Sequence, residues 1–300
     1  MKGIGQWFML GAFALAPLLI LAAGSEGGES SKTNPEMARA LKKYPKADAD
    51  GDGTLTQDEL KAFMAKMDAA KQPRKGGGVP AAARPFYETR EYAGPDGRTM
   101  VYHLMKPKDY DAAEKYPLVL SLHGAGGNSH AAWTLAKEEM RERYPCFVLA
   151  PEAREAETWG PYPGRPVIDV QPLALAVLAQ LQEEFSIDPK RLYVTGQSMG
   201  GFGTYAFLIE NPDLFAAGAP ICGRHDPAMA EKIKNIPLWI FHGDADTTIS
   251  VDYSREMVKA LQAAGGDPKY TEFPGVGHNS WTPALAMPEF WDWMFAQRKE

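Results

Sequence analysis

A serine held between glycines constrains this chain more than any other feature. Residues 192–194 are apolar and predict a short buried strand, and Gly196-Gln-Ser198-Met-Gly200 follows at once. Residues 202–210 then carry helix formers with an apolar face. A serine between a strand and a helix sits on a tight turn, where glycines two residues before and after it avoid clashes. The turn exposes the hydroxyl at a helix N-terminus, so we interpret Ser198 as a nucleophile rather than a helix N-cap.

The C-terminal two-thirds of the chain alternates predicted strands with predicted helices. The strands are expected at 86–92, 99–105, 117–122, 146–150, 192–194, 215–222, 237–241 and 269–273. The clearest helices are expected at 131–143, 170–185 and 254–264. Because strands that alternate with helices form parallel sheets covered by those helices, residues 86–300 are predicted to be an α/β domain with a mostly parallel sheet.

Two loops after predicted strands carry the partners that a serine nucleophile needs. A serine hydroxyl attacks when a base takes its proton and an acid orients that base, and in this architecture both follow the serine in the chain. Asp244 and Asp246 come after the strand at 237–241, and His278 comes after the strand at 269–273. We assign Ser198, His278 and Asp246 as a catalytic triad, with Asp244 as the alternative acid.

The other histidines offer one rival base, His225, which also follows a predicted strand. The remaining four are expected to be structural: His103, His123, His130 and His242. No histidine pair has the spacing of a metalloprotease, and the two cysteines form no zinc motif, so a zinc hydrolase is disfavoured.

The glycine-rich sequence His123-Gly-Ala-Gly-Gly127 follows a buried strand and predicts part of an oxyanion hole. The oxyanion formed by nucleophilic attack needs N–H donors that are fixed in advance. The backbone N–H of Met199, at the start of the helix after Ser198, is one candidate donor. Ala125 is the other, with Gly126 as its substitute. A plain strand-to-helix loop is the alternative interpretation.

Four motifs in this order resemble a known group of enzymes. They are His123-Gly-Ala-Gly-Gly127, Gly196-Gln-Ser-Met-Gly-Gly201, His242-Gly-Asp-Ala-Asp246 and Gly277-His-Asn-Ser-Trp281. Together they resemble the α/β-hydrolases of the polyhydroxybutyrate depolymerase, feruloyl esterase and acetylxylan esterase group, over about residues 84–299. The resemblance implies the α/β-hydrolase fold and a small or polymeric ester substrate, with no cofactor for catalysis. Three aromatic residues are expected either to form a wall for a phenolic acid or a sugar, or to pack in the core: Trp281, Trp159 and Tyr162.

The sheet order of that group also separates the two cysteines. It would place the Cys146 strand three places from the Cys222 strand, or about 14 Å at ~4.8 Å per place. A disulfide requires Cα atoms within roughly 7 Å, so two free thiols are expected.

The N-terminus indicates export. Residues 1–24 carry a lysine, a long apolar run and a cleavage-like Leu21-Ala-Ala-Gly-Ser25, which favours a signal peptide over an uncleaved membrane anchor. The remainder is therefore expected to be secreted or periplasmic. Residues 25–33 are rich in Ser, Gly and Glu and predict a disordered tether. The net charge of −6 gives no basic surface for nucleic acid.

Residues 34–71 predict a single EF-hand, and residues 72–85, with their Pro and Gly, predict a linker. Calcium takes six to eight oxygen ligands, which the loop offers at every diagnostic position. Leu55 would occupy a short strand that needs a partner: the large domain, a second chain or an external protein. The proposed calcium ligands are Asp48, Asp50, Asp52, Thr54, Thr56 and Glu59.

Taken together, the sequence predicts an exported serine carboxylic-ester hydrolase with a calcium-binding helix-loop-helix. Two alternatives stay open. One is a serine peptidase of the prolyl-oligopeptidase type without its propeller, and the other is an inactive calcium-dependent binding module.

Overall fold

A computed structural model of the chain divides it into two compact units, residues 1–75 with 162–168 and residues 76–161 with 169–300. The structure describes residues 30–33, 37–38, 41–42, 47–56, 58–59, 62, 78–95, 97–154, 157–160 and 168–300. The predicted signal or anchor at 1–24 and the aromatic residue Tyr162 lie outside these residues. Within the described ranges, every helix is too short or too polar to cross a bilayer.

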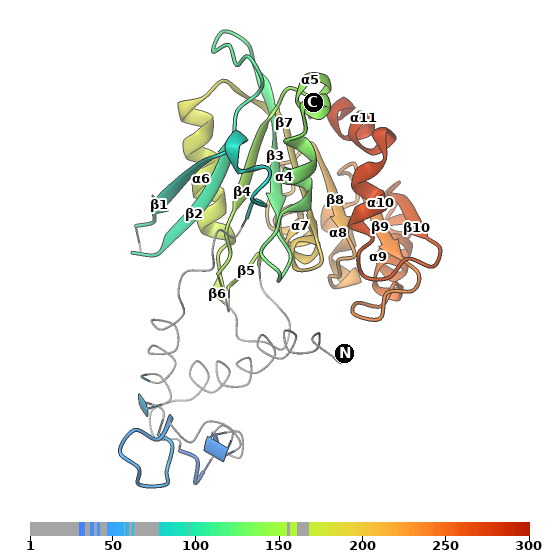
Figure 1. The fold of residues 1–300 in the computed structure, drawn as a ribbon. Helices are drawn as coiled ribbons and strands as arrows, with labels where there is room; N and C mark the ends of the chain where they lie inside the picture. The colour runs from blue at the N-terminus through green and yellow to red at the C-terminus, as the bar shows by residue number, and fades with distance from the viewer. Residues whose placement is uncertain are drawn as a thin grey trace, which may run out of the picture. The chain divides into compact units, whose positions relative to one another are not determined.

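Eight strands of the larger unit form one sheet: β1 (Glu88–Ala93), β2 (Thr99–Met105), β3 (Tyr116–Leu122), β4 (Phe147–Pro151), β7 (Ile187–Gln197), β8 (Ala217–Ile221), β9 (Trp239–Gly243) and β10 (Lys269–Phe273) (Figure 1). Their order is β1-β2-β4-β3-β7-β8-β9-β10. The β1–β2 and β2–β4 pairs are antiparallel, and all the later pairs are parallel. The predicted α/β architecture with a mostly parallel sheet is confirmed.

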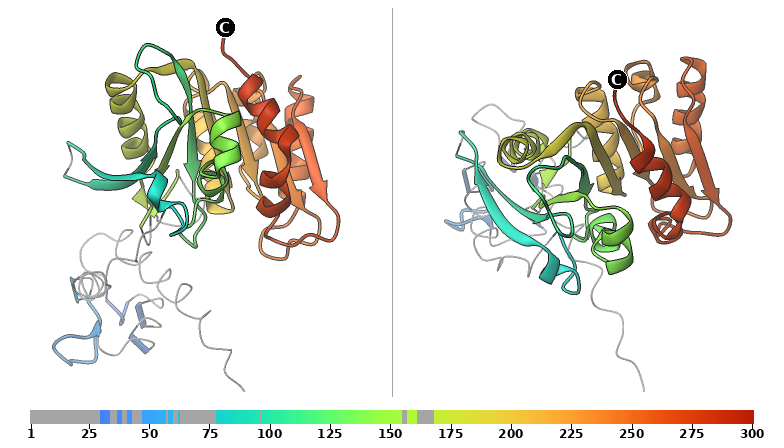
Figure 2. Two further views of the ribbon diagram at one scale, coloured as in Figure 1. Left: turned by 45° about the horizontal axis from the view of Figure 1, so that its top comes forward. Right: turned by 90° about the horizontal axis from the view of Figure 1, so that it is seen from above.

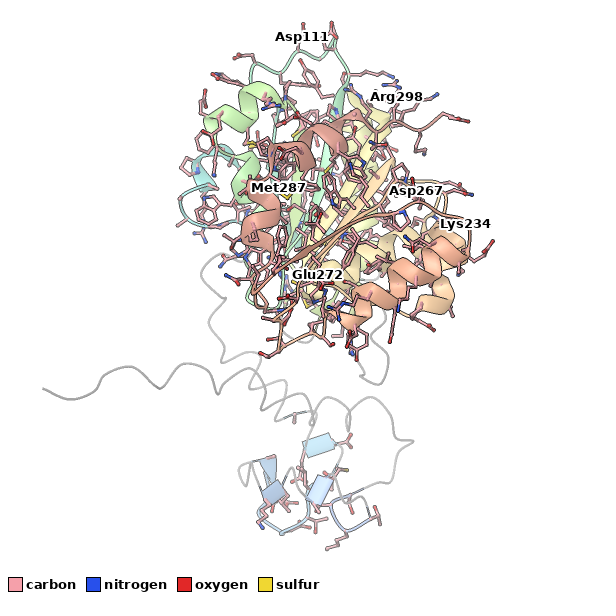
Figure 3. All side chains as sticks on the ribbon, turned by 90° about the vertical axis from the view of Figure 1, so that its right-hand side faces the viewer. Asp111, Lys234, Asp267, Glu272, Met287 and Arg298 are labelled. Carbon is pink, nitrogen blue, oxygen red and sulfur yellow. The ribbon has the colours of Figure 1, made fainter. Side chains whose placement is uncertain are left out.

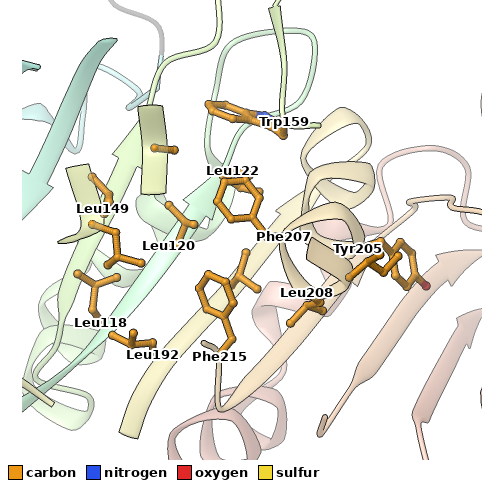
Figure 4. Packing of buried hydrophobic residues seen from close by; sticks show 14 of the residues in the cluster. Leu118, Leu120, Leu122, Leu149, Trp159, Leu192, Tyr205, Phe207, Leu208 and Phe215 are labelled. Carbon is orange, nitrogen blue, oxygen red and sulfur yellow. The ribbon is translucent and has the colours of Figure 1, made fainter. Parts of the chain in front are cut away.

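Helices cover both faces of this sheet (Figure 2). On one face α6 (Gln171–Glu184), α7 (Met199–Glu210) and α9 (Asp252–Ala263) pack in one apolar cluster with Leu118, Leu120 and Leu122 of β3 (Figure 4). On the other face α4 (His130–Leu135), α10 (Trp281–Ala286) and α11 (Pro288–Ala296) pack with Val119. Successive side chains of a strand point to opposite faces of the sheet, which is why Val119 lies on the other face from Leu118 and Leu120. Each fully buried leucine contributes about 1.5–3 kcal/mol.

The shorter elements connect these layers: η2 (Arg84–Phe86), α5 (Glu138–Arg143), β5 (Glu157–Thr158), β6 (Ile168–Asp169), η3 (Pro227–Met229) and α8 (Ala230–Ile233). The helix expected at 131–143 is in fact two helices, α4 and α5, because Lys137 between them is extended (φ −65°, ψ 143°). Ala131, Ala132 and Leu135 of α4 enter the core, whereas α5 buries none of its residues. The chain therefore bends where its burial changes.

The domain begins earlier than Phe86, the boundary expected from the sequence. The Gly78 N–H donates to the Gly127 carbonyl at 2.5 Å, and the Ser129 N–H donates to the Gly78 carbonyl at 2.8 Å. Val79 is fully buried. Residues 78–85 were expected in the linker because they lack periodicity, but backbone pairing holds them on the larger unit.

The sheet order also separates the two thiols, as the resemblance implied. Cys146 precedes β4 and Cys222 follows β8, three places away in the sheet, and both cysteines are free and buried.

At the outer end of the sheet, Glu272 on β10 pairs with Arg255 at 2.6 Å (Figure 3). Charged side chains on an edge strand discourage pairing with another chain.

In the smaller unit the Leu55 strand has a partner in its own chain. The Ser31 N–H donates to the Leu55 carbonyl, and the Leu55 N–H donates to Ser31 Oγ, both at 2.8 Å. Ser30 forms an antiparallel bridge with Thr56. Residues 30 and 31, which belong to the segment expected to be a tether, therefore pair with the strand that contains Leu55. Their composition is that of a flexible segment, but the backbone N–H and the hydroxyl of Ser31 form hydrogen bonds with the backbone of Leu55.

Candidate active site

Ser198 lies on the turn between β7 and α7, with φ 55° and ψ −117°. This conformation is rare for a residue with a side chain and costs on the order of 1–3 kcal/mol. The surrounding turn leaves no room for other side chains. A Cβ on Gly196 would lie 2.6 Å from the Gly200 carbonyl oxygen, and one on Gly200 would lie 2.2 Å from the Leu122 carbonyl oxygen. The glycines thus allow the sharp turn that presents the serine hydroxyl.

Two hydrogen bonds join Ser198, His278 and Asp246 in a chain. His278 Nε2 lies 2.9 Å from Ser198 Oγ, and His278 Nδ1 lies 2.7 Å from Asp246 Oδ2. An ionised carboxylate only accepts hydrogen bonds, so Nδ1 carries the proton of the neutral ring. Nε2 is then the acceptor for the serine hydroxyl. This is the arrangement in which an imidazole can take a proton from a serine.

The loops after β9 and β10 meet closely enough to bring these side chains together. A Cβ on Gly243 would lie 2.1 Å from the Val276 carbonyl oxygen, so the two backbones pack in direct contact. The Gly275 N–H donates to Asp244 Oδ1 at 2.6 Å. Asp244, the alternative acid, therefore braces the loop that carries His278, and Asp246 is the acid in contact with the imidazole.

Asp246 is fully buried at its side chain, whereas that of His278 is 24% exposed. Burial alone would raise the pKa of Asp246, but hydrogen bonds from His278 and from the backbone N–H groups of Ile249 and Thr248 outweigh it and lower that pKa. The carboxylate is therefore ionised across the range in which an imidazole titrates.

His242 is a site residue that its sequence context did not reveal. It lies at the end of β9, and its fully buried Nε2 is 3.3 Å from Asp246 Oδ2 and 3.0 Å from the Ile249 carbonyl oxygen. Its Nδ1 is 2.7 Å from Ser254 Oγ. Burial lowers the pKa of His242, so a neutral ring faces the carboxylate. A histidine before a glycine at a strand end is commonly structural, so there was little reason in the sequence to place His242 in the site. Its one signal is its position four residues before Asp246.

The His123–Gly127 loop passes directly against the nucleophile. A Cβ on Gly124 would lie 3.5 Å from Ser198 Cβ. His123 fixes the loop, because its Nε2 accepts from the Ala153 N–H at 2.9 Å and its Nδ1 donates to the Gly124 carbonyl at 2.7 Å. Ala125 and Gly126 are exposed on this loop.

Met199, the first residue of α7, is half-buried beside the serine. Its backbone N–H belongs to the first turn of the helix, where N–H groups have no partner within the helix. The donors expected for an oxyanion thus belong to the first turn of α7 and to the fixed loop after β3.

The aromatic residues expected near the site have different roles. The Trp281 ring packs edge-to-face on His278 with centroids 5.5 Å apart and stacks on His130 at 5.3 Å. Trp133, which is 44% exposed, continues this row beside His130 at 6.1 Å. Trp159, in contrast, is buried, and its Nε1 donates to the His123 carbonyl at 2.9 Å (Figure 4). Of the two roles left open for Trp159, packing in the core fits its burial and contact with substrate does not, since the indole supports the loop from inside.

The rival base His225 is next to Tyr205 of α7. Its ring centroid is 6.4 Å from that of Tyr205, and burial lowers its pKa. His103 is also structural, because its Nε2 pairs with Glu152 at 2.7 Å. Of the described histidines, His278 is the one hydrogen-bonded to Ser198.

Comparison with known proteins gives the same fold. The sequence model of the prolyl oligopeptidase family matches residues 171–239. The "Putative esterase NocK" of Nocardia uniformis subsp. tsuyamanensis is 33% identical over 57% of this chain and 52% of its own length. The "Probable feruloyl esterase C" of Aspergillus oryzae is 25% identical over 60% of this chain and 67% of its own. The crystal structure of a thermostable esterase superposes with a TM-score of 0.68 at 35% identity, covering 73% of this chain and 64% of that one.

These relatives establish the α/β-hydrolase fold of the larger unit. The chain spans about half the length of the NocK protein and under two-thirds of the thermostable esterase.

Proposed function

We propose that this α/β-hydrolase chain is a serine hydrolase that cleaves carboxylic esters. The observation that carries the proposal is the hydrogen-bonded chain from Ser198 through His278 to Asp246. The esterase names of its relatives support an ester over other acyl substrates. The sequence match to the prolyl oligopeptidase family supports the runner-up, a serine peptidase.

The reaction follows from the positions of these atoms. His278 Nε2 takes the proton of Ser198 as Oγ attacks the ester carbonyl, and Asp246 stabilises the resulting imidazolium. N–H groups of Met199 and of Ala125 or Gly126 receive the oxyanion. His278 then protonates the departing alcohol, which leaves an acyl group on Ser198. Water that gives its proton to His278 attacks this acyl group and releases the acid.

The aromatic row of Trp133, His130 and Trp281 supports an ester with a planar or ring-bearing group. Trp281 lies against His278, so a ring bound on this row would sit beside the reacting carbonyl. Aromatic faces bind phenolic rings and sugar faces through stacking. A feruloyl or sugar-linked ester is therefore the substrate class that we favour within the general assignment.

A panel of matched esters and amides tests the assignment. We expect turnover of p-nitrophenyl acetate and of feruloyl, acetyl-xylan or hydroxybutyrate esters. Turnover of the corresponding anilides should be slower, because an alcohol or phenol leaves with little help from a general acid, whereas the anilide nitrogen must be protonated as it leaves. Initial rates at equal concentration measure this difference. Faster cleavage of peptide anilides would replace the esterase by the peptidase, and absence of fluorophosphonate labelling at Ser198 would support the inactive binding module.

We further propose that the smaller unit binds calcium. Carboxylate oxygens of Asp48, Asp50 and Asp52 lie within 4.8 Å of one another, which suits a hard cation with oxygen ligands. The Thr56 backbone N–H and hydroxyl donate to Glu59 and lower its pKa to about 2, so this ligand is ionised. The carbonyl of Thr54 and the hydroxyl of Thr56 complete the set of calcium ligands. The bound ion would stabilise this unit or tether it to a partner.

Residues 1–24 support the further proposal that the protein is exported.

Calcium titration of the full chain by calorimetry tests this site. Glu59→Gln removes one charge from the bidentate position, so we expect at least about 10-fold weaker binding. Asp58→Asn is the matched control, because this acid is next to Glu59 but outside the ligand positions. Equal heats for the wild type and Glu59→Gln would contradict the site.

A further inference from the structure

A buried thiol lies beside the catalytic hydrogen bonds but takes no part in the proposed reaction. Cys222 directly follows β8, the neighbour of β7 in the sheet, and adopts an unusual positive φ of 41°. Its Sγ, a carboxylate oxygen of Asp246 and a ring nitrogen of His278 all lie within 4.8 Å of one another. These three groups come from three different strand ends and meet at one point.

We propose that Cys222, Asp246 and His278 form a binding site for zinc or a similar soft divalent cation, and that the bound ion reversibly blocks catalysis. Thiolate, imidazole and carboxylate are the three side-chain ligand types of protein zinc sites. With metal–ligand bonds of about 2.0–2.3 Å, neighbouring ligands of a tetrahedral ion lie roughly 3.3–3.8 Å apart. The three ligand atoms lie within 4.8 Å of one another, and His278 Nδ1 is 2.7 Å from Asp246 Oδ2, so an ion would enter by moving this pair slightly apart. The thiol selects against calcium and magnesium, which prefer oxygen.

The charges of the site balance those of the ion. Asp246 is an anion, and Cys222 becomes one by releasing its proton to solvent when the metal–sulfur bond forms. The +2 charge of the cation is then neutralised by two anionic ligands, so the occupied site carries no net charge at a buried position. Without metal the thiol stays protonated, because burial raises the pKa of Cys222 to about 12. Metal binding releases one proton per ion.

Inhibition follows from where the imidazole proton must go. His278 Nδ1 faces Asp246, so a cation shared by these two residues binds at Nδ1 and replaces its hydrogen. The single proton of the neutral ring then resides on Nε2, which faces Ser198. A protonated Nε2 cannot accept the serine proton. The metal thus removes the base while the nucleophile stays in place.

An entry route exists at the histidine. The side chain of His278 is 24% exposed, whereas that of Asp246 is fully covered. Rotation of the imidazole would admit an ion from solvent to the carboxylate and thiol behind it. The fourth position of a tetrahedral ion is left for water.

Cobalt binding tests the site without relying on activity. Co²⁺ is added to the full chain in the presence of excess calcium, which fills any site whose ligands are all oxygen atoms. We expect a thiolate-to-cobalt charge-transfer absorption that saturates at one Co²⁺ per chain and disappears when Zn²⁺ displaces the cobalt. Cys222→Ser and Cys222→Ala should abolish this absorption. Cys146→Ser is the matched control, because its thiol lies three strands away, and it should retain the absorption. Persistence of the band in both Cys222 variants, with thermal unfolding like the wild type, overturns the site, as does its absence in the wild type.

Inhibition rests on the proposed esterase function and has its own readout. Zn²⁺ should inhibit ester hydrolysis by the wild type and by Cys146→Ser, with recovery on adding a chelator. The Cys222 variants should need at least about 10-fold more Zn²⁺ for half-inhibition, since loss of a direct ligand should cost no less than loss of an outer-shell partner. Equal zinc sensitivity of the wild type and both Cys222 variants overturns the inhibitory role. If the metal-free chain hydrolyses no ester, the proposed function fails while the cobalt titration still decides the metal site.

Discussion

Ser198→Ala should lower ester turnover by about 10⁶-fold, the loss seen when a serine triad loses its nucleophile. The substitution removes one oxygen atom, and alanine keeps the backbone of the turn. His278 then faces a methyl group, so no acyl-enzyme can form. Steady-state hydrolysis of p-nitrophenyl acetate, with active-site titration of the wild type, measures the effect.

Ser250→Ala is a matched control for this substitution. It removes an exposed hydroxyl after β9 that does not contact the triad, so near wild-type turnover is expected. Retention of most activity by Ser198→Ala would mean that another residue is the nucleophile.

Asp246→Asn should lower kcat by about 10⁴-fold while the fold is kept, by analogy with the same change in a serine protease. The amide can donate to His278 Nδ1, which favours the ring tautomer with its proton on Nε2. That tautomer cannot accept the proton of Ser198. The variant also loses the anion that stabilises the imidazolium. Comparison of kcat and KM separates this effect from weaker substrate binding.

Asp252→Asn is the control for this second change, because it is an exposed acid at the start of α9 that pairs with Arg255. A small loss of kcat in Asp246→Asn, equal to that of the control, would exclude Asp246 as the orienting acid. Asp244 would then have to be reconsidered in spite of its bond to the Gly275 N–H.

Much of the fold was predictable because the parallel strands have a strong local signal. Residues 117–122 are an almost continuous apolar run, and β3 occupies Tyr116–Leu122. The strand expected at 269–273 has the observed bounds of β10. The partners of Ser198 could be sought among few residues, because chain order and strand ends leave few acids and histidines at the same sheet edge.

Other features depend on contacts that no local pattern encodes. Trp159 lies in a segment rich in Gly and aromatic residues, as a substrate loop would, yet its indole is enclosed by the core. His242 resembles any strand-end histidine until β9 is folded beside the Asp246 loop. Cys222 becomes relevant only when β8, β9 and β10 lie side by side. In each case the deciding information is a distance between segments that are far apart in the sequence.

The pairing of Ser31 with Leu55 limits how far the N-terminus could be trimmed without loss of a contact. Cleavage anywhere before Ser30 leaves both hydrogen bonds intact. Removal of Ser31 itself would leave the N–H and the carbonyl of Leu55 without these partners, next to the acidic loop. Any cleavage of the N-terminal segment is therefore coupled to the integrity of that loop through Ser31.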